Sequence, residues 1–276
     1  MKKKPAVAFA PFAPVAGLAV IVPALNEQGG LAACLDSIAA AARRLPWPPE
    51  VVVADGGSTD ATVAVAVGRA ATIVNSQRGR GAQIRAGIEA SGADTLLVLH
   101  ADCRLEPDAL AAIVAALGAR PLAAGGALGL RFEPDFFLSG LAGRLNSLKT
   151  RLTGVAFGDQ GQFFRRDALS RIGGFPDLAL MEDVELSLRL REAGEIVFIG
   201  RGVIASSRAW KQYGFFGNFR RMLPLLFTYL VRRRLGLSID AAAYYRKYYR
   251  GAAPDPARGS ALDPARGSAP GPRRGD

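Results

Sequence analysis

Short apolar runs alternate with segments of helical spacing through the first 117 residues of the chain. The apolar runs cover residues 18–22, 50–54, 72–75 and 95–99, and the helical segments cover 28–44, 61–69, 81–91 and 107–117. Helices of this length between strands form βαβ units, whose strands run parallel in one sheet. The pattern therefore predicts an α/β fold with a Rossmann-like, mostly parallel central sheet flanked by helices.

The second half of the chain continues this pattern less regularly. Strands are expected at 123–132, 160–164 and 196–199, and helices at 136–152 and 183–192. We predict one folded domain over 18–235, a basic, proline-rich lead-in at 1–17 and amphipathic C-terminal helices with an extension at 236–251. Residues 252–276, rich in Pro, Gly and Arg, cannot bury a core and are expected to be disordered.

Residues 1–14 loosely resemble a signal peptide, with a basic start and an apolar stretch. Three prolines interrupt that stretch, and it continues directly into the strand expected at 18–22. Cleavage there would remove a core strand, so we expect the segment to be retained. No stretch reaches about 18 uninterrupted apolar residues, so no membrane-spanning helix is predicted.

Composition excludes several kinds of site. The two cysteines, Cys34 and Cys103, form neither a disulfide framework nor a zinc pattern, and a reducing, cytoplasmic setting is the default. The only histidine is His100, which excludes a multi-histidine metal site and a Ser/His/Asp triad elsewhere. The net charge of +11 favours anionic partners such as nucleic acid, anionic lipid or phosphorylated substrates, and charge alone does not choose among them.

The strand expected at 50–54 ends in Asp55-Gly56-Gly57-Ser58-Thr59-Asp60. In open α/β sheets, ligands lie just beyond the carboxyl ends of the strands. Glycines there let the backbone approach a ligand closely. The alternative is a strand-to-helix turn in which Asp55 or Ser58 caps the next helix. The isolated motif supports both interpretations equally.

Two further segments indicate a phosphate-bearing ligand at the same edge of the sheet. Asp102 follows the strand expected at 95–99, and a carboxylate there can hold Mg²⁺ or Mn²⁺ against a diphosphate. The segment Arg78-Gly79-Arg80-Gly81-Ala82-Gln83 places two arginines and two glycines at a helix start, which favours phosphate binding. No Gly-Lys-Ser/Thr follows, so this is not a Walker loop.

Another polar cluster lies in the second half of the chain. Gly158-Asp159-Gln160-Gly161 precedes an aromatic strand, and Gly173-Gly174-Phe175-Pro176 precedes Leu180-Met181-Glu182-Asp183-Val184-Glu185. Acidic side chains at a helix start interact favourably with the helix dipole. This accounts for Glu182 or Asp183 but not for the paired glycines ahead of them. A carboxylate beside a glycine-opened pocket is a candidate general base.

Together these motifs resemble inverting family 2 glycosyltransferases of the GT-A fold, and within them the subgroup called radical-SAM/selenodomain-associated transferase 2. The matching segments occur in family order over roughly residues 18–235. They are Val-Pro-Ala-Leu-Asn-Glu (22–27), Asp-Gly-Gly-Ser-Thr-Asp (55–60), Arg-Gly-Arg-Gly-Ala-Gln (78–83), Leu-His-Ala-Asp (99–102), Arg-Leu-Thr-Gly (151–154), Gly-Asp-Gln (158–160), Gly-Gly-Phe-Pro (173–176), Leu-Met-Glu-Asp (180–183) and Ser-Arg-Ala-Trp (207–210).

The resemblance implies a nucleotide-sugar site built by the first half of the chain. Asp55, with Pro23, Asn26 and Glu27 nearby, would bind the base and ribose, and Arg80 would face the diphosphate. Asp102, the last acid of the family's Asp-X-Asp element, would bind Mn²⁺ or Mg²⁺. His100 stands where many members carry the first acid. The implied donor-binding set is completed by Gln83, His100 and Ala101.

The resemblance also implies the reacting groups and the acceptor side. Asp183 would be the catalytic base and Glu182 its neighbour. Asp159, Gln160 and Gly174 would line the sugar or acceptor pocket, and Arg208 and Trp210 resemble the family's acceptor-side Arg-Trp element. The segment 207–210 lacks the glutamine of processive enzymes, which argues against a polymerising synthase.

These roles imply an inverting transfer from a nucleotide-diphosphate sugar, with UDP-sugar favoured by family habit. A lipid-linked or carotenoid-type acceptor fits the basic, aromatic segment 213–235. That segment fits either a helix in the membrane interface or a helix packed on the domain. We expect a cytoplasmic protein that is peripheral on the inner face of the membrane if the helix binds it.

Three alternatives remain. A sugar-1-phosphate nucleotidyltransferase would carry a Gly-X-Gly-Thr-Arg-like loop after the first strand, where this chain has Pro23-Ala24-Leu25-Asn26-Glu27. A catalytically silent nucleotide-sugar binding module would keep the fold. A basic nucleic-acid-binding protein would fit the charge, although part of that charge lies in the tail at 252–276.

Overall fold

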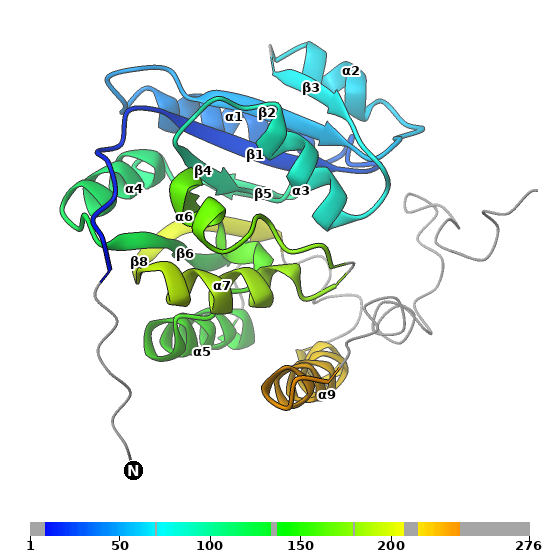
Figure 1. Cartoon of the computed structure of the whole chain (residues 1–276). Helices are drawn as coiled ribbons and strands as arrows, with labels where there is room; N and C mark the ends of the chain where they lie inside the picture. The colour runs from blue at the N-terminus through cyan, green and yellow to red at the C-terminus, as the bar shows by residue number, and fades with distance from the viewer. Residues whose placement is uncertain (1–8, 70, 134–136, 179, 207–214, 238–276) are drawn as a thin grey trace, which may run out of the picture.

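The computed structural model describes residues 9–69, 71–133, 137–178, 180–206 and 215–237. In this part of the chain one sheet has the strand order β3-β2-β1-β4-β7-β6-β8-β5 (Figure 1). Its strands are β1 (Leu18–Ala24), β2 (Glu50–Asp55), β3 (Thr72–Asn75), β4 (Thr95–Val98), β5 (Cys103–Leu105), β6 (Ala123–Glu133), β7 (Gln162–Arg165) and β8 (Glu195–Ser206). Only β7 and β5 run antiparallel to their neighbours, so the predicted mostly parallel α/β fold is confirmed.

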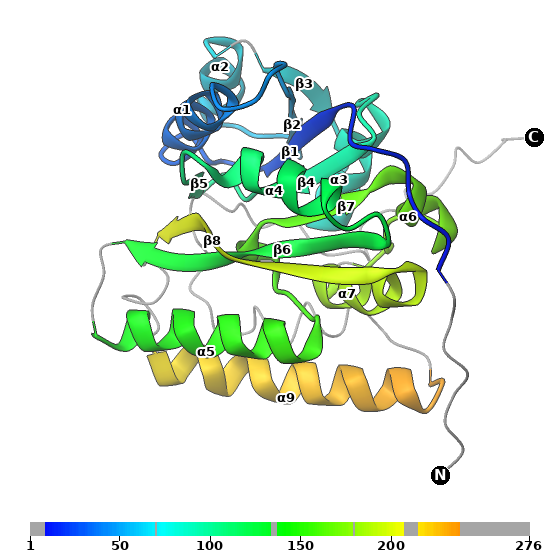
Figure 2. The same cartoon turned by 90° about the vertical axis from the view of Figure 1, so that its left-hand side faces the viewer.

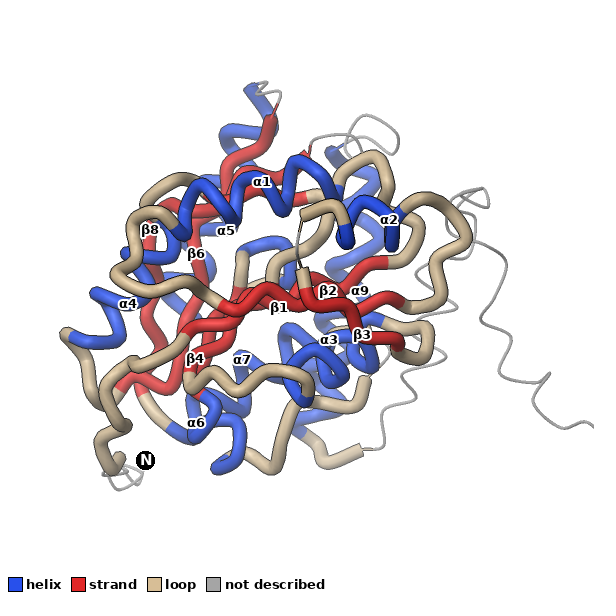
Figure 3. Tube along the Cα trace, turned by 90° about the horizontal axis from the view of Figure 1, so that it is seen from above, coloured by secondary structure: helices blue, strands red, loops and turns tan. Residues whose placement is uncertain are grey.

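Helices cover both faces of this sheet. They are α1 (Leu31–Ala42), α2 (Thr62–Val67), α3 (Arg80–Glu89), α4 (Ala109–Gly118), α5 (Phe137–Thr153), α6 (Arg166–Arg171), α7 (Glu182–Ala193) and α9 (Phe215–Arg234), with a 3₁₀ turn, η1 (Gly158–Gln160). Seen from above, the strands run between α1 on one side and α3, α6 and α7 on the other (Figure 3).

The alternation of side chains along β1 explains this layering. Leu18, Val20 and Val22 belong to the core cluster that includes the buried residues of α1 and α4. Ala19 and Ile21 face the opposite cluster, which includes buried residues of α3, α6 and α7. Successive strand residues point to opposite faces, so a fully buried strand must be apolar throughout.

Several element boundaries differ from the sequence-based expectation. β1 continues through Pro23 to Ala24, and β8 has 12 residues where a strand over 196–199 was expected. Leu128 of β6 pairs with Ile199 of β8, and the next residue, Gly129, pairs with Gly202. This register shift lets the pairing with β6 continue beyond the glycines of β8. The expected strand at 160–164 begins at Gln162, because residues 158–160 form η1. β5 and α6 were not predicted, since runs of 3 and 6 residues give no clear periodicity.

The C-terminal helix is observed as α9 and packs on the domain. Leu225 and Tyr229 are buried against Met181 and Val184 beside α7. None of the helices in the described part of the chain combines the length and apolarity needed to cross a membrane. Arg208 and Trp210, the first residues of the lead-in (1–8), most of the predicted extension (238–251) and the tail (252–276) lie outside the described residues.

Candidate active site

The loops that follow β1 and β2 are bonded to each other at the edge of the sheet. Asn26, whose φ is 54°, donates from its backbone N to Ser58 Oγ (2.9 Å) and accepts at Oδ1 from Thr59 N (2.8 Å). The backbone N of Glu27 donates to Thr62 Oγ1 (2.8 Å). Residues 23–27 and 55–60, predicted separately from the sequence, therefore form one continuous rim.

Asp55 organises the turn that follows its own strand. Its buried carboxylate accepts from Gly57 N (3.0 Å), from Ser58 N (3.0 Å) and from the Ser58 hydroxyl. Gly57 has a φ of 86°, which favours glycine. The helix-capping alternative is wrong, because α2 begins at Thr62, whose N donates to Asp60 Oδ1 (2.9 Å). Ser58 N also lies 3.3 Å from Asp55 Oδ1, so both carboxylate oxygens are already bonded within the turn, and contact of Asp55 with a nucleotide stays a prediction.

Gln83 lies beneath this rim. Its buried Nε2 donates to the backbone oxygens of Ala24 (2.5 Å) and Ala54 (3.2 Å), which end β1 and approach the end of β2. A Cβ on Gly56 would lie 3.0 Å from the same nitrogen, so a side chain there would push the Gln83 amide aside. Gln83 thus ties the two strand ends together, and its contact with a nucleotide stays a prediction.

Arg80 links the first half of the chain to the acid pair, Glu182 and Asp183, in the second half. Its guanidinium NH1 lies 3.3 Å from Glu182 Oε1, which joins the N-terminus of α3 to the N-terminus of α7. Glu182 is only 2% exposed. Burial raises the pKa of Glu182 to about 7, with Arg80 opposing the shift and Asp183 adding to it. Glu182 can therefore hold a proton near neutral pH.

Asp183 is held by the turn at Gly158. Its Oδ2 accepts from Gly158 N (2.6 Å) and its Oδ1 accepts from Val184 N (2.7 Å). Met181, directly before the acid pair, has a φ of 67°, a strained conformation for a residue with a Cβ. Buried contacts with Leu225 and Tyr229 hold it there.

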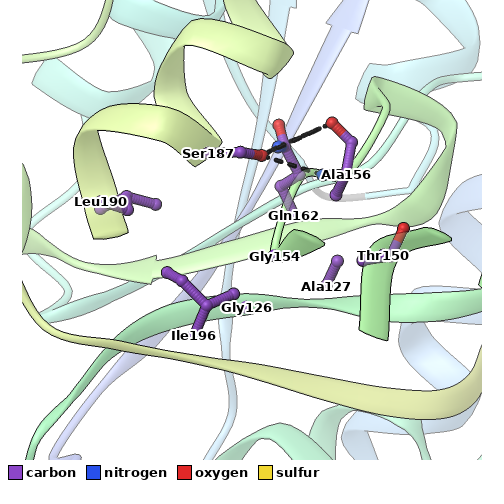
Figure 4. A pocket seen from close by; sticks show the side chains of 9 residues that line it. All are labelled: Gly126, Ala127, Thr150, Gly154, Ala156, Gln162, Ser187, Leu190 and Ile196. Atoms are coloured by element: carbon purple, nitrogen blue, oxygen red, sulfur yellow. Dashed lines mark hydrogen bonds between the residues drawn. The ribbon is translucent and has the colours of Figure 1, made fainter. Parts of the chain in front are cut away.

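A small pocket lies between α7, β6 and the segment that leads to η1 (Figure 4). It is lined by Gly126, Ala127, Thr150, Gly154, Ala156, Gln162, Ser187, Leu190 and Ile196. Gln162 Nε2 donates to Ser187 Oγ (2.8 Å) and to the backbone oxygen of Asp183 (2.9 Å), and Ala156 N also donates to Ser187 Oγ (3.0 Å). These bonds hold the loop before η1 against α7. The residues around the pocket therefore support the backbone of the acid pair, and the pocket itself is not the candidate active site.

His100 and Asp102 lie where the chain leaves β4 for β5. A Cβ on Gly158 would meet His100 Nε2 at 2.8 Å and Arg80 NH1 at 3.4 Å, so these side chains converge on the turn that holds Asp183. Ala101 is buried, whereas Asp102 is exposed. Burial raises the pKa values of the Cys34 thiol and of Asp159, and the charge of Asp102 adds to both shifts.

Lys149 belongs to this cluster and was missed by sequence reasoning. Burial raises the pKa of Asp159 to about 6, opposed by Lys149 and reinforced by Asp183 and Asp102. Burial lowers the pKa of Lys149 to about 8, while Asp159 and Asp183 oppose that shift. Lys149 Nζ lies 3.3 Å from the centroid of the Phe157 ring. No signal in the sequence distinguishes this lysine from a solvated one on an amphipathic helix.

Gln160 is buried and fastens η1 to α5. Its Oε1 accepts from Thr150 Oγ1 (3.0 Å) and from Phe157 N (3.0 Å). Gly174, with a φ of 95°, belongs to the turn after α6. The site therefore joins Arg80, His100, Asp159, Glu182 and Asp183, whereas Gln83 and Gln160 hold the backbone around it.

The predicted metal position fits an ion held mainly by substrate. Among the described residues, no group of three or more His, Cys, Asp or Glu side chains could hold a metal ion. Mg²⁺ and similar hard ions are commonly bound by one or two carboxylates together with substrate phosphates and water. The exposed carboxylate of Asp102, whose charge acts on Asp159, matches that donor set.

The sheet order, the rim after β1 and β2 and the acid pair opposite Arg80 define an α/β protein of the GT-A class. The chain belongs to glycosyl transferase family 2, whose sequence model matches residues 19–173. A similar curated protein is the undecaprenyl-phosphate 4-deoxy-4-formamido-L-arabinose transferase of Serratia proteamaculans, 26% identical over 160 residues. That alignment covers 55% of this chain and 49% of that protein, so the chain spans about half the length of the curated relatives it matches.

Solved structures share the fold. A mannosyltransferase from Pyrobaculum calidifontis, in complex with GDP-Man and Mn²⁺, is 25% identical with a TM-score of 0.57, and the match covers 81% of this chain and 65% of that one. Glucosyl-3-phosphoglycerate synthase from Mycobacterium tuberculosis, in complex with Mn²⁺, UDP and phosphoglyceric acid, is 19% identical with a TM-score of 0.55. That match covers 81% of this chain and 80% of that one.

Proposed function

We propose that this chain transfers a sugar, with inversion, from a nucleotide-diphosphate sugar to a lipid-linked acceptor. The observation that carries the proposal is the convergence of Arg80, Glu182 and Asp183 with the Gly158 turn at the edge of the rim. Family membership supports the reaction class, and the name of the Serratia relative supports a lipid-phosphate acceptor. The order of the motifs further supports the radical-SAM/selenodomain-associated subgroup.

The donor would lie along the rim. Asp55, Asn26 and the backbone from Pro23 to Glu27 would take the base and ribose, and Arg80 would face the diphosphate. Similar folds hold UDP or GDP-Man, and we favour a UDP-sugar. Asp102 would hold Mn²⁺ or Mg²⁺, which supplies positive charge to the leaving diphosphate.

Asp183 would act on the acceptor. Its carboxylate removes the proton from the acceptor oxygen, and that oxygen forms a bond to the anomeric carbon of the sugar. The bond from that carbon to the diphosphate breaks, and the nucleoside diphosphate leaves with the electron pair. Arg80 stabilises the charge that develops on the leaving group. The bond from Gly158 N orients Asp183 for this role.

The acceptor and cellular location are inferred from the surroundings of the site. Asp159, Gln160, Gly174, Arg208 and Trp210 would line the acceptor side. A polyprenyl phosphate or a carotenoid carboxylic acid fits a lipid-linked acceptor. We propose a cytoplasmic protein, peripheral on the inner face of the membrane.

The substitution Asp183→Asn tests the mechanism. We expect it to retain UDP binding and to lower the rate of UDP release from UDP-sugar in the presence of Mn²⁺ by about 10²- to 10⁴-fold, the usual contribution of general base catalysis. Asp177→Asn, which changes an exposed acid in the loop before α7, should leave the rate unchanged. A wild-type rate in Asp183→Asn would exclude Asp183 as the base. UDP binding without turnover in the wild type would identify a silent binding module.

A further inference from the structure

Helix α9 has two apolar faces, of which only one is covered. Leu225 and Tyr229 face the domain and are buried, and Arg233 follows them on the same stripe. Phe227 and Leu235 are 70% and 65% exposed, and Val231 between them is 39% exposed. Residues two positions apart on a helix point about 200° apart, so the second stripe lies opposite the first. The domain therefore leaves an apolar stripe of α9 uncovered.

Helix α5 carries a similar stripe. Leu145, Leu148 and Leu152 are 48%, 52% and 76% exposed and lie at spacings of three and four residues. Figures 1 and 2 place α5 and α9 side by side on the same side of the molecule, below β6 and β8 in Figure 2. We call the exposed side chains of α5, α9 and residues 235–237 the α5–α9 surface.

Exposed large apolar residues are concentrated on this surface. Of the 11 in the described part of the chain, 8 belong to it. Contiguous apolar patches on soluble domains commonly mark interaction sites, whereas single exposed residues do not. The remaining three are separate from it and include Val63 and Val67 on α2.

The charge of these two helices indicates which kind of partner fits the α5–α9 surface. The sequences of α5 and α9 contain three and five basic residues and no acidic residue, although Lys149 belongs to the site cluster and Arg233 is bonded to Glu185. Arg144 and Arg151 on α5 and Arg234 on α9 are exposed. Basic amphipathic helices lie in the interface of anionic membranes, with the apolar stripe inserted and the arginines at the headgroups.

The covered stripe of α9 is bonded directly to the helix of the acid pair. Glu185, two residues after Asp183, accepts from the Tyr229 hydroxyl, from Arg233 Nε (2.7 Å) and from Arg189 Nε (2.7 Å). Burial alone would raise the pKa of Glu185, but these hydrogen bonds hold it below its usual range. The charged cluster fixes α9 on α7 and so fixes the distance between the uncovered stripe and the acid pair.

We propose that the α5–α9 surface docks on an anionic lipid bilayer. The biological role of this docking rests on the proposed function, because docking there would bring the acid pair to a lipid-linked acceptor. The docking itself does not depend on that function. The occupant is the bilayer itself, since an apolar stripe with basic and no acidic residues on both helices is complementary to anionic headgroups and acyl chains.

Vesicle co-sedimentation of the full chain tests the docking. We expect binding to vesicles of phosphatidylcholine with phosphatidylglycerol, weaker binding to pure phosphatidylcholine, and loss of affinity as salt rises. The variant Phe227→Ser/Val231→Ser/Leu235→Ser should bind at least tenfold more weakly. The matched control Val63→Ser/Val67→Ser, on α2, should bind as the wild type does.

The outcomes separate this proposal from the proposed function. UDP binding should be the same in wild type and triple variant, so its absence in both counts against the function and leaves the docking result standing. Equal vesicle binding by wild type and triple variant would overturn the docking. A wild-type dimer in light scattering that the triple variant abolishes, without vesicle binding, would assign the surface to a second copy. If the triple variant fails to fold, Phe227→Ser alone provides the comparison.

Discussion

Gly158 lies where the first and second halves of the site meet. A Cβ there would lie 2.8 Å from His100 Nε2, so the imidazole would have to move, and the backbone N of Gly158 also donates to Asp183. A side chain at this position would therefore change how the two halves of the site meet. Functional geometry of this kind tolerates displacements of only fractions of an ångström.

We expect Gly158→Ala to lower the transfer rate by about 10- to 100-fold, because a shift of roughly 1 Å at a site can cost that much. The control is Gly200→Ala, since a Cβ on Gly200 meets nothing within 4 Å. Rates of UDP release and melting temperatures of the two variants provide the measurement. Equal rates would show that Gly158 does not fix the site.

Glu182 makes stability depend on pH. Burial raises its pKa from 4.5 to about 7, so the folded state binds this proton more tightly than the unfolded chain does. The stability from this group is complete below about pH 4.5 and is lost as the pH rises towards 7.

Glu182→Gln should therefore raise the melting temperature at pH 8 and leave it unchanged near pH 4.5. The expected gain is on the order of 1–3 kcal/mol, because one pKa unit corresponds to about 1.4 kcal/mol. Melting curves from pH 4.5 to 8 measure the effect, with Glu89→Gln at the exposed end of α3 as the control. A lower melting temperature at pH 8 would show that the ion pair with Arg80 outweighs burial.

At the scale of residues, the sequence indicates candidate site residues where polar side chains follow a strand end or lie next to glycines. Asp55, Arg80, Asp102 and Asp183 were all predicted because local patterns surround them, and their roles stay predictions. Lys149 was missed, since its importance comes from burial beside Asp159, which depends on tertiary contacts. The capping interpretation of Asp55 failed for a local reason, because Asp60, two residues before Thr62, accepts from the first turn of α2 instead.

At the scale of elements, α9 and α7 behave as one unit. Tyr229, Arg233 and Arg189 converge on one carboxylate of α7, and Leu225 packs on Met181 and Val184. We expect the two helices to open together in hydrogen exchange, since shared buried contacts make opening cooperative.

Tyr229→Phe tests this unit. It removes one hydrogen bond to a charged group, worth about 1.5–3 kcal/mol, and leaves Glu185 paired with both arginines. We expect faster amide exchange in α9 and a lower melting temperature. Thr228→Ala, an exposed change on the same helix that removes only the bond to the Pro224 oxygen, should change neither. Unchanged exchange in Tyr229→Phe would show that α9 is held by its apolar contacts alone.

Element prediction succeeded where periodicity was long and failed where it was interrupted. The βαβ alternation of residues 18–117 gave the parallel sheet, and α9 was found between arginine clusters. β8 was predicted too short, since glycines end the apolar pattern while the register shift against β6 lets pairing continue. Nothing in the sequence indicates that β7 is antiparallel, because an apolar strand has the same side-chain pattern whichever way it runs in the sheet.

At the scale of the whole molecule, donor binding should stabilise the fold. A ligand at 100 times its dissociation constant adds about 2.7 kcal/mol, which for a domain of this size raises the melting temperature by roughly 5–10 °C. We expect UDP with Mn²⁺ to give the largest shift, GDP a smaller one, and UDP without metal an intermediate one. Thermal denaturation with each nucleotide measures this. No shift with any of them would contradict the proposed function.

The reversed strand β7 has a consequence for how proteins of this architecture can diversify. It pairs with β4 on one edge and β6 on the other, and so separates β3-β2-β1-β4 from β6-β8-β5. The rim after β1 and β2 belongs to the first block, whereas α5 and α9 lie below the second. Both blocks contribute to one apolar core, since buried residues of β1 belong to the same cluster as buried residues of β6 and β8. Changes in that core must therefore be matched in both blocks, whereas the loops that follow the strands of each block can vary separately.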